Sequence, residues 1–135
     1  MMVNQNIVVN TITEKSSDSV SNPRESLVDL EHLEAICGGD LEFEQEVLQM
    51  FVEDTVENLE AAREALGNSD CEVLLHNAHQ IKGSSANVGV PSITEIASRL
   101  ETQARQKSLV NAPELIDSLT ELLVQVRAFI HNRCG

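Results

Sequence analysis

Apolar residues recur every three or four positions from about residue 26 to the C-terminus, with polar residues between them. This is the period of an α-helix with one buried face, whereas a strand would alternate at every second residue. Capping residues, glycines and prolines interrupt the pattern and divide it into five helices. These helices are predicted to run from Ser26 to Cys37, from Asp40 to Gly67, from Ser69 to about Gly89, from Pro91 through Ala104, and from Asn111 through Ile130.

Residues at the helix ends support these boundaries. A glycine pair ends the first helix, and an aspartate then caps the second, which a further glycine ends. The third and fifth helices begin with the spacing of a capping box, and the fourth and fifth carry a proline in the first turn. The residues concerned are Gly38-Gly39, Asp40, Gly67, Ser69 with Glu72, Pro91, and Asn111 with Glu114 around Pro113.

The same period predicts which side chains form the core, because residues three and four apart share one face of a helix. In the second helix these are Leu48, Phe51, Thr55, Leu59, Ala62 and Leu66. The third helix contributes Leu74, Ala78, Ile81, Ser85 and Val88, and the fourth contributes Ile93, Ile96, Ala97, Leu100 and Ala104. In the fifth helix they are Leu115, Leu119, Leu122, Val126 and Ile130.

Four long amphipathic helices with short connections predict an all-α fold, an antiparallel up-and-down four-helix bundle. The short additional N-terminal helix is expected to cover one end of it. Residues 1–25 are rich in Asn, Ser, Thr and Val and are interpreted as a flexible leader, whereas residues 26–135 form the bundle domain.

The composition narrows the range of partners. The 135 residues include 9 basic and 22 acidic side chains, a net charge of −13, which disfavours nucleic acid and anionic membrane surfaces. No apolar run reaches the roughly 20 residues of a membrane span, and no signal peptide is evident. Three cysteines without a CxxC pair favour a reducing compartment. We therefore expect a cytoplasmic protein, and a monomer.

The third predicted helix contains an unusual run from His79 to Ser85. A glycine inside a helix costs about 1 kcal/mol relative to alanine, yet Gly83 lies one turn after His79 on the same face. Lys82 is three residues after the histidine and also within reach. This leaves an imidazole with open space on one side and a positive charge on the other, as the approach of a doubly charged anion would require.

The helical period also predicts that His79 faces solvent. At about 100° per residue it lies roughly 140° from the centre of the core stripe of its helix. Leu75 and Ala86 flank it and form a small apolar surround, which is typical of a docking surface. His76 is predicted to be exposed too, but it lacks the lysine and the glycine.

Other chemistries fit the residues less well. His76 and His79 could bind a metal, but zinc needs three or four ligands and the helix offers no more. No histidine follows a glutamate by three residues, which excludes a di-iron bundle of the common type. Ser84 and Ser85 lie mid-helix, where a hydroxyl is not presented as a hydrolase nucleophile and can bond back to a carbonyl one turn earlier. No phosphate-binding loop for ATP is present, and we expect neither a metal nor another cofactor.

The run His79-Gln80-Ile81-Lys82-Gly83-Ser84-Ser85-Ala86-Asn87-Val88-Gly89 resembles the signature of the histidine-containing phosphotransfer (HPt) domain family. The signature is a histidine, two residues, Lys-Gly, then serine and a small residue, with a glycine closing the helix. The resemblance covers about residues 28 to 132.

The resemblance implies that Nε2 of His79 accepts a phosphoryl group from the aspartate of a receiver domain and passes it to a second receiver. Lys82 would stabilise the phosphoryl charge, Gly83 would leave room for the partner, and Glu101 would correspond to a polar residue near the histidine in relatives. Hybrid histidine kinases and response regulators are the implied partners. Mg²⁺ and the acidic pocket would come from the receiver, so the domain would not be an enzyme by itself.

Two functions from different classes remain open at this point. The first is a phosphorelay intermediate that carries a phosphoryl group on His79. The alternative is a non-catalytic helical bundle that docks receiver domains without being phosphorylated.

Overall fold

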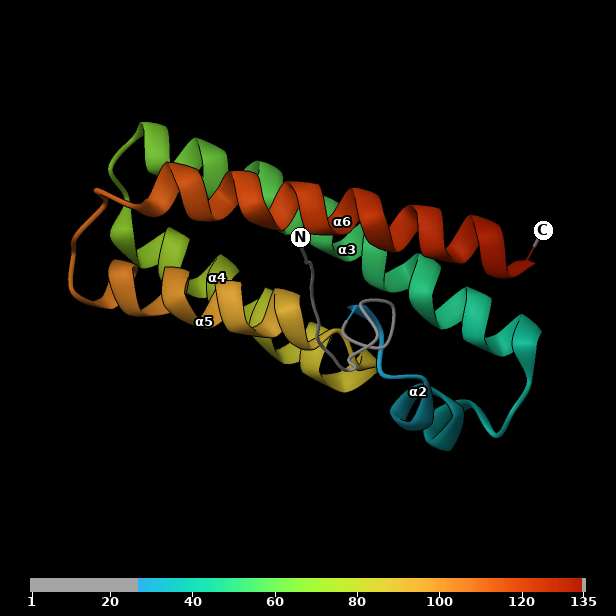
Figure 1. Cartoon of the computed structure of the whole chain (residues 1–135). Coiled ribbons are helices and arrows are strands. Elements are labelled where there is room, and N and C mark those ends of the chain that lie inside the picture. The colour runs from blue at the N-terminus through green and yellow to red at the C-terminus, as the bar shows by residue number, and fades with distance from the viewer. Residues whose placement is uncertain (1–26, 135) are drawn as a thin grey trace, which may run out of the picture.

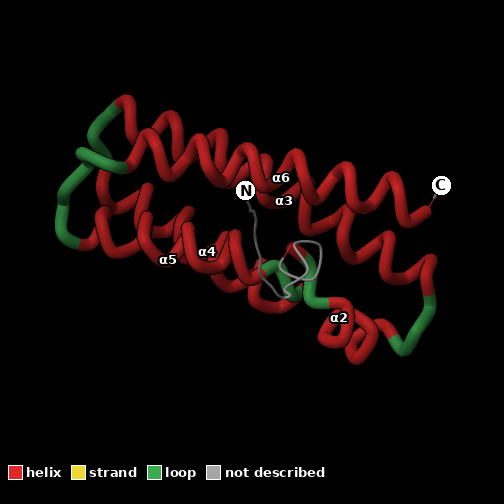
Figure 2. Tube along the Cα trace, in the orientation of Figure 1, coloured by secondary structure: helices red, strands yellow, loops and turns green. Residues whose placement is uncertain are grey.

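The computed structural model describes residues 27–134, and these form helices and connecting loops without a strand (Figures 1 and 2). The helices are α2 (Leu30–Cys37), α3 (Leu41–Gly67), α4 (Cys71–Val88), α5 (Pro91–Arg105) and α6 (Ala112–Cys134). The leader predicted at residues 1–25 lies outside the described residues.

The four long helices form the antiparallel up-and-down bundle that the sequence predicts. Each one contacts its two neighbours in the order α3, α4, α5, α6 and back to α3, so the core lies on the common axis. Figure 1 shows α3 and α6 as one pair and α4 and α5 as the other. Because α3 and α6 are the longer helices, α2 occupies the space beyond the end of α4 and α5, where it packs against α3. None of the helices is long and apolar enough to span a membrane, as far as residues 27–134 are concerned.

Aspartate side chains cap the N-terminal ends of α2, α3 and α4. Asp40 caps α3 as predicted, and its Oδ1 accepts from the backbone N–H of Glu42 at 3.0 Å. Asp29 caps α2, which begins at Leu30, whereas the helix start predicted at Ser26 lies outside the described residues. The predicted cap of the third helix is wrong, since Asp70 and not Ser69 accepts from the N–H of Val73.

Gly67 is the last residue of α3 and does not provide a left-handed cap as expected. The cap position is Asn68, and the left-handed backbone that reverses the chain occurs at Ser69, where φ is 55°. Asp70 then closes this turn, because its N–H donates to the carbonyl of Ala65 at 2.8 Å. The turn is therefore made by the polar residues that follow Gly67.

The core stripes of α3, α4 and α5 agree closely with the predicted positions. All five positions predicted for α4 are buried, while Leu66 in α3 and Ile96 in α5 are half-buried at the margin. The stripe of α6 is partly wrong, because Leu115 and Leu122 are half-buried and their neighbours Ile116 and Leu123 occupy the core. Both alternatives fit the helical period in a leucine-rich helix, so only packing against α3 and α5 selects one.

Gly89 is required where α4 ends against α2. Its φ is 85°, and a Cβ there would lie 3.1 Å from Cδ2 of His32 and 3.3 Å from the carbonyl oxygen of Asp29. His32, which has no evident partner in the sequence, donates from Nε2 to the carbonyl of Asn87 at 2.7 Å. Asp29 donates its N–H to the carbonyl of Gly89 at 2.7 Å. These two hydrogen bonds therefore attach α2 and its cap to the C-terminal end of α4.

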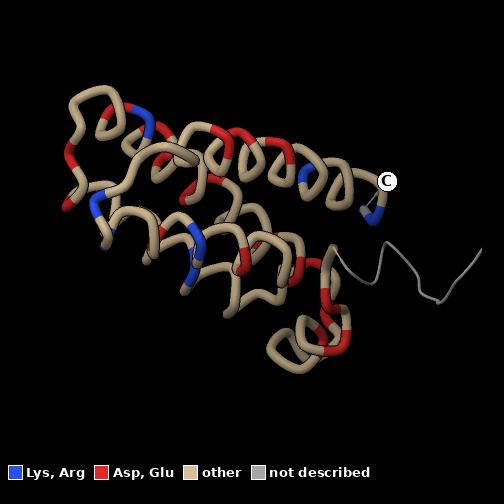
Figure 3. The backbone as a smooth tube through the Cα atoms, turned by 60° about the vertical axis from the view of Figure 1, so that its left-hand side comes forward, with Lys and Arg blue, Asp and Glu red and all other residues tan. Residues whose placement is uncertain are grey.

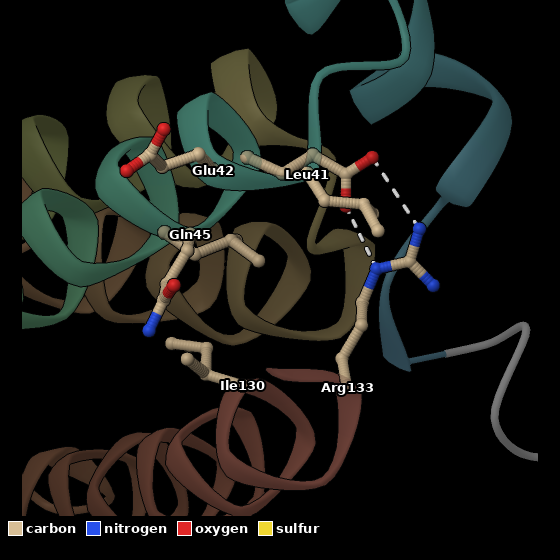
Figure 4. Close-up of a pocket in the computed structure, with 7 residues that line it drawn as sticks. Leu41, Glu42, Gln45, Ile130 and Arg133 are labelled. Carbon is tan, nitrogen blue, oxygen red and sulfur yellow. Dashed lines mark hydrogen bonds and ion pairs between the residues drawn. The ribbon is translucent and has the colours of Figure 1, made fainter. Parts of the chain in front are cut away.

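A buried ion pair joins the start of α3 to the end of α6, at the same end of the bundle as α2. Arg133 donates to both carboxylate oxygens of Glu44, from Nε at 2.7 Å and from Nη2 at 3.3 Å, and the side chain of Glu44 is only 2% exposed (Figure 4). The pair lines a pocket of about 280 Å³ between Leu41 and Ile130.

Burial is the main cause that raises the pKa of the nearby Cys37 thiol, and the negative charges of Glu44 and Asp40 raise it further. Cys37 and Cys71 are both free thiols.

We expect Arg133→Met to lower the free energy of unfolding by about 2 kcal/mol, because it leaves the Glu44 carboxylate buried without its cation. Denaturant unfolding followed by circular dichroism measures the change. Arg127→Met, at an exposed position of the same helix, is the matched control and is expected to change stability little. Equal midpoints for the two variants would show that the buried pair does not stabilise the bundle.

Candidate functional site

His79 lies on the outward face of α4, as the helical period predicts. Its side chain is 65% exposed, whereas Ala78 and Ile81 on either side of it are fully buried. The helix is held in this rotation by its core stripe, which packs against α3 and α5. The imidazole is therefore fixed to a rigid element and open to solvent.

One nitrogen of the His79 ring is occupied by a carboxylate of the neighbouring helix. Nδ1 lies 2.9 Å from Oε2 of Glu101, which projects from α5. An ionised carboxylate only accepts hydrogen bonds, so Nδ1 carries the proton and donates. In the neutral ring the lone pair then belongs to Nε2, the nitrogen on the far side of the ring from Glu101.

Glu101 is the buried centre of the site. Its side chain is 5% exposed, and Nζ of Lys82 donates to its other oxygen, Oε1, at 2.7 Å. The hydrogen bond from Lys82 is the main reason why the pKa of Glu101 is below its ordinary value, although burial opposes this effect. The hydrogen bond from His79 and the charges of Lys82 and Arg105 lower the pKa further. The carboxylate is thus kept ionised inside the protein.

Lys82 has an ionic partner outside its own helix. Positions 78 and 86 hold no glutamate, so no ion pair at a spacing of four residues forms within α4. The partner comes from α5, 19 residues further along the chain. Lys82 and His79 therefore share a single carboxylate, one on each oxygen.

The surface around the imidazole is open. A Cβ built at Gly83 would meet no atom within 4 Å, so the missing side chain leaves free space and not a contact within the bundle. Ala86 is exposed and Leu75 is half-buried on the same helix.

Ser84 and Ser85 hydrogen bond to backbone carbonyls of their own helix. Ser84 Oγ donates to the carbonyl of Ile81 at 3.4 Å, and Ser85 Oγ donates to that of Lys82 at 3.0 Å. Ser85 also bonds to Oγ1 of Thr94 at 2.7 Å, which ties α4 to α5. The two hydroxyls are therefore engaged in backbone and interhelical contacts.

His76, the other histidine of α4, has no such environment. It is exposed, and no hydrogen bond or ion pair links its side chain to another residue within 27–134. Over the same range, no three His, Cys, Asp or Glu side chains are grouped closely enough to hold a metal ion.

The charges on the helices that form the site differ from those on the rest of the protein. Residues 71–107, which include α4 and α5, carry four basic and three acidic side chains. Residues 29–70, which include α2 and α3, carry thirteen acidic side chains and one basic one. Figure 3 shows this contrast between the two parts of the bundle. His79 therefore lies on the least acidic part of a protein whose net charge is −13.

The family model of the Hpt domain matches residues 46–129, which contain all four long helices in whole or in large part. The chain belongs to the Hpt domain family. Members of this family carry out histidine phosphotransfer in phosphorelays, and His79 lies within the matched range. No curated protein sequence matches the chain significantly.

Two solved structures resemble this Hpt domain. One is histidine-containing phosphotransfer protein B (HptB) from Pseudomonas aeruginosa PAO1, with 30% identity and a TM-score of 0.74 over 84% of this chain and 96% of that one. The other is the HPT domain of a sensor hybrid histidine kinase from Shewanella, with 22% identity and a TM-score of 0.62 over 76% and 88%. The second supports the fold alone.

The sequence contained two signals for the buried side of the site. Glu101 falls on the buried stripe of its helix, four residues after Ala97 and next to Leu100, and a carboxylate at such a position usually has a specific partner. Arg105 follows Glu101 by four residues, the spacing of an ion pair on a helix. The sequence interpretation mentioned Glu101 only through the resemblance and missed Arg105, which donates from Nη2 to Oε2 of Glu101 at 3.4 Å.

We expect Glu101 to make folding depend on pH in the acid range. Its folded-state pKa is below the ordinary 4.5, so the stability it confers is complete above that value and is lost as the pH falls through the folded-state pKa. Glu101→Gln should therefore flatten the fall in the free energy of unfolding below about pH 4.5. Urea unfolding from pH 3 to 7 measures this.

Glu95→Gln provides the control, because Glu95 lies on the same helix but is 67% exposed in a surface pair with Arg99. Its pH profile should parallel that of the wild type. A Glu101→Gln profile parallel to both would contradict the assignment of a depressed pKa to Glu101.

Proposed function

We propose that His79 is the residue of this Hpt domain that carries the phosphoryl group. Nε2 accepts it from a phosphorylated receiver-domain aspartate and passes it to the aspartate of another receiver. The observation that carries the proposal is the arrangement of one exposed imidazole whose Nδ1 is bound to a buried carboxylate, with Lys82 beside it. His76 has the exposure but none of the partners.

The hydrogen bond to Glu101 supports Nε2 as the nucleophile. Because the proton is held on Nδ1, the lone pair of Nε2 is available to attack phosphorus at neutral pH. The new N–P bond forms as the P–O bond to the aspartate breaks, and the electron pair of that P–O bond returns to the receiver's carboxylate. The Nδ1 proton stays, so the ring becomes a phospho-imidazolium whose positive charge lies against Glu101.

The same contact supports the onward step. In the second transfer the N–P bond breaks, its electron pair returns to Nε2, and the next receiver's carboxylate forms the new P–O bond. A ring that keeps its Nδ1 proton leaves as neutral imidazole, which is a far better leaving group than an imidazolate anion. Glu101 therefore favours transfer in both directions by holding one proton at one atom.

Lys82 is proposed to stabilise the transferred group. Phosphoryl transfer depends on in-line placement and on neutralisation of charge on the phosphoryl oxygens. The Lys82 side chain is 36% exposed and starts one turn after His79, so its ammonium can turn toward a group attached to Nε2.

Gly83 is proposed to give the receiver access to His79, with Leu75 and Ala86 as contact residues beside it. The aspartate must come into bonding distance of phosphorus, which brings two protein surfaces together around the imidazole. Open space at Gly83 supports this role. Ser84, which is bonded to its own helix, is at most a secondary contributor to the site.

This domain supplies only half of an active site and no nucleotide site, so transfer is catalysed together with the receiver. Hybrid histidine kinases and response regulators are its partners, it acts as a monomer, and it is located in the cytoplasm.

Incubation with a phosphorylated receiver tests the assignment. The wild type and His76→Gln should both take up phosphate, whereas His79→Gln should take up none because it lacks the nucleophile. The label should be labile in acid and stable in alkali, as expected for a phosphoramidate. Equal labelling of both variants would overturn the assignment, and receiver binding without any label on the wild type would identify a docking module.

Substitutions of Gly83 separate helix stability from access. Gly83→Ala should raise the free energy of unfolding by about 1 kcal/mol, because a helical glycine is replaced where the side chain meets no atom. Gly83→Gln should also fold, yet slow transfer by about tenfold or more, since its longer side chain obstructs the partner.

The alanine variant is the control for the added stability, and quenched-flow transfer assays compare the two. If Gly83→Gln transferred as fast as Gly83→Ala, the glycine would have no role in access.

A further inference from the structure

The buried carboxylate of Glu101 has three cationic or hydrogen-bonding partners for its two oxygens. Lys82 occupies Oε1 at 2.7 Å, while His79 Nδ1 and Arg105 Nη2 approach Oε2 at 2.9 and 3.4 Å. The Arg105 contact is the longest, and its side chain is 63% exposed. Arg105 therefore lies beside the carboxylate but makes only a long hydrogen bond to it.

Phosphorylation of His79 would change what Lys82 must do. A phosphoryl group adds close to two negative charges and three acceptor oxygens on the open side of the ring. When the Lys82 ammonium turns its N–H donors toward the phosphoryl oxygens, its contact with Glu101, now the shortest of the site at 2.7 Å, is weakened or lost. Glu101 would then lose the partner that contributes most to keeping it ionised.

We propose that Arg105 is a positioning residue that takes over Glu101 when Lys82 turns to the phosphoryl group. This inference rests on the proposed function of His79. Arg105 acts on the reacting atoms only through the carboxylate, and it keeps Glu101 charged and bonded to Nδ1 throughout the reaction.

The chemistry of the side chain suits this exchange. A guanidinium has five N–H donors in a planar fork and stays charged at every relevant pH, so it can replace an ammonium on a carboxylate without proton transfer. Arg105 lies one turn after Glu101 on α5, and closing from 3.4 Å to an ordinary charge-assisted bond needs a shift of well under 1 Å. Its exposure leaves the side chain free to make that movement.

Without a cation to replace Lys82, the buried Glu101 carboxylate would be left in an unfavourable state. A carboxylate that is 5% exposed and loses its main cation would take up a proton or pull away from the ring. The charged and titratable groups bonded to it are His79 and Lys82 from α4 and Arg105 from its own helix, and no ion pair reaches it from α6 within residues 27–134. Arg105 is therefore the group placed to compensate for Lys82.

Arg105→Met tests the proposal, with Arg99→Met as the matched control. Arg99 lies on the same helix, is similarly exposed at 60%, and also pairs with a glutamate four residues earlier, but that partner is Glu95 on the surface. Arg105→Met should slow transfer from a phosphorylated receiver by about tenfold, and Arg105→Lys should recover most of the rate. Arg99→Met should stay within about twofold of the wild type.

A second background distinguishes action through Glu101 from direct contact with the phosphoryl group or the receiver. In Glu101→Gln the buried charge is gone, so adding Arg105→Met should cost no more than about twofold further. A full tenfold loss in that background would mean that Arg105 touches the phosphoryl group or the partner, and would overturn the proposal.

Nitrogen NMR of phosphorylated His79 gives a readout that a merely structural role would not change. The Nδ1 resonance should be that of a protonated nitrogen bonded to a carboxylate in the wild type and in Arg99→Met, and should move in Arg105→Met because this bond is weakened. Identical Nδ1 resonances in the three proteins would contradict the inference.

Failure of this inference can be told apart from failure of the proposed function. If the wild type takes up no label on His79, the phosphotransfer assignment itself is wrong. If it is labelled normally while Arg105→Met behaves like Arg99→Met, only the role of Arg105 is wrong.

Discussion

A single buried carboxylate organises the site of this protein. Glu101 lies between α4 and α5, where an isolated negative charge would be strongly unfavourable, so it has to be met by positive or donating groups. His79 and Lys82 meet it, and each is thereby fixed in position relative to the other. Orientation of the imidazole, availability of Nε2 and retention of the lysine near the ring all follow from one electrostatic requirement.

The packing of the bundle brings the groups that Glu101 needs to its carboxylate. His79 and Glu101 are 22 residues apart and meet because α4 and α5 run antiparallel with a fixed register. The register is set by the turn in which Gly89 ends α4 and Pro91 begins α5, and by the bond between Ser85 and Thr94 just beside it. The contacts of Asp29 and His32 with the end of α4 hold this turn from the outside.

The uneven distribution of charge adds a further constraint on partners. The acidic side chains of α2 and α3 make that part of the bundle negative, whereas α4 and α5 are close to neutral (Figure 3). A partner whose own active site is acidic is repelled least from the side that carries His79. The charge pattern therefore favours the encounter that the proposed phosphotransfer through His79 needs, although it contributes no contact to the chemistry.

The helices and the outward position of His79 could be predicted from the sequence, because the helical period relates each residue only to its near neighbours. The same reasoning located Gly83 and Lys82 beside the histidine. It failed at Ser69, because the Asp70 side chain, which accepts a hydrogen bond from the N–H of Val73, decides the helix start, and at Leu115 and Leu122, where two leucine-rich faces fit equally well.

The chain by itself thus determined the helices, most of their buried faces and the outward position of His79, since all of these depend on local spacing. Only the tertiary structure decided which oxygen each nitrogen binds, that Lys82 shares a carboxylate with His79, and that Arg105 lies 3.4 Å from the same carboxylate. Such contacts depend on the register between two helices, which is fixed by packing of the whole core and is not encoded in the spacing of either helix.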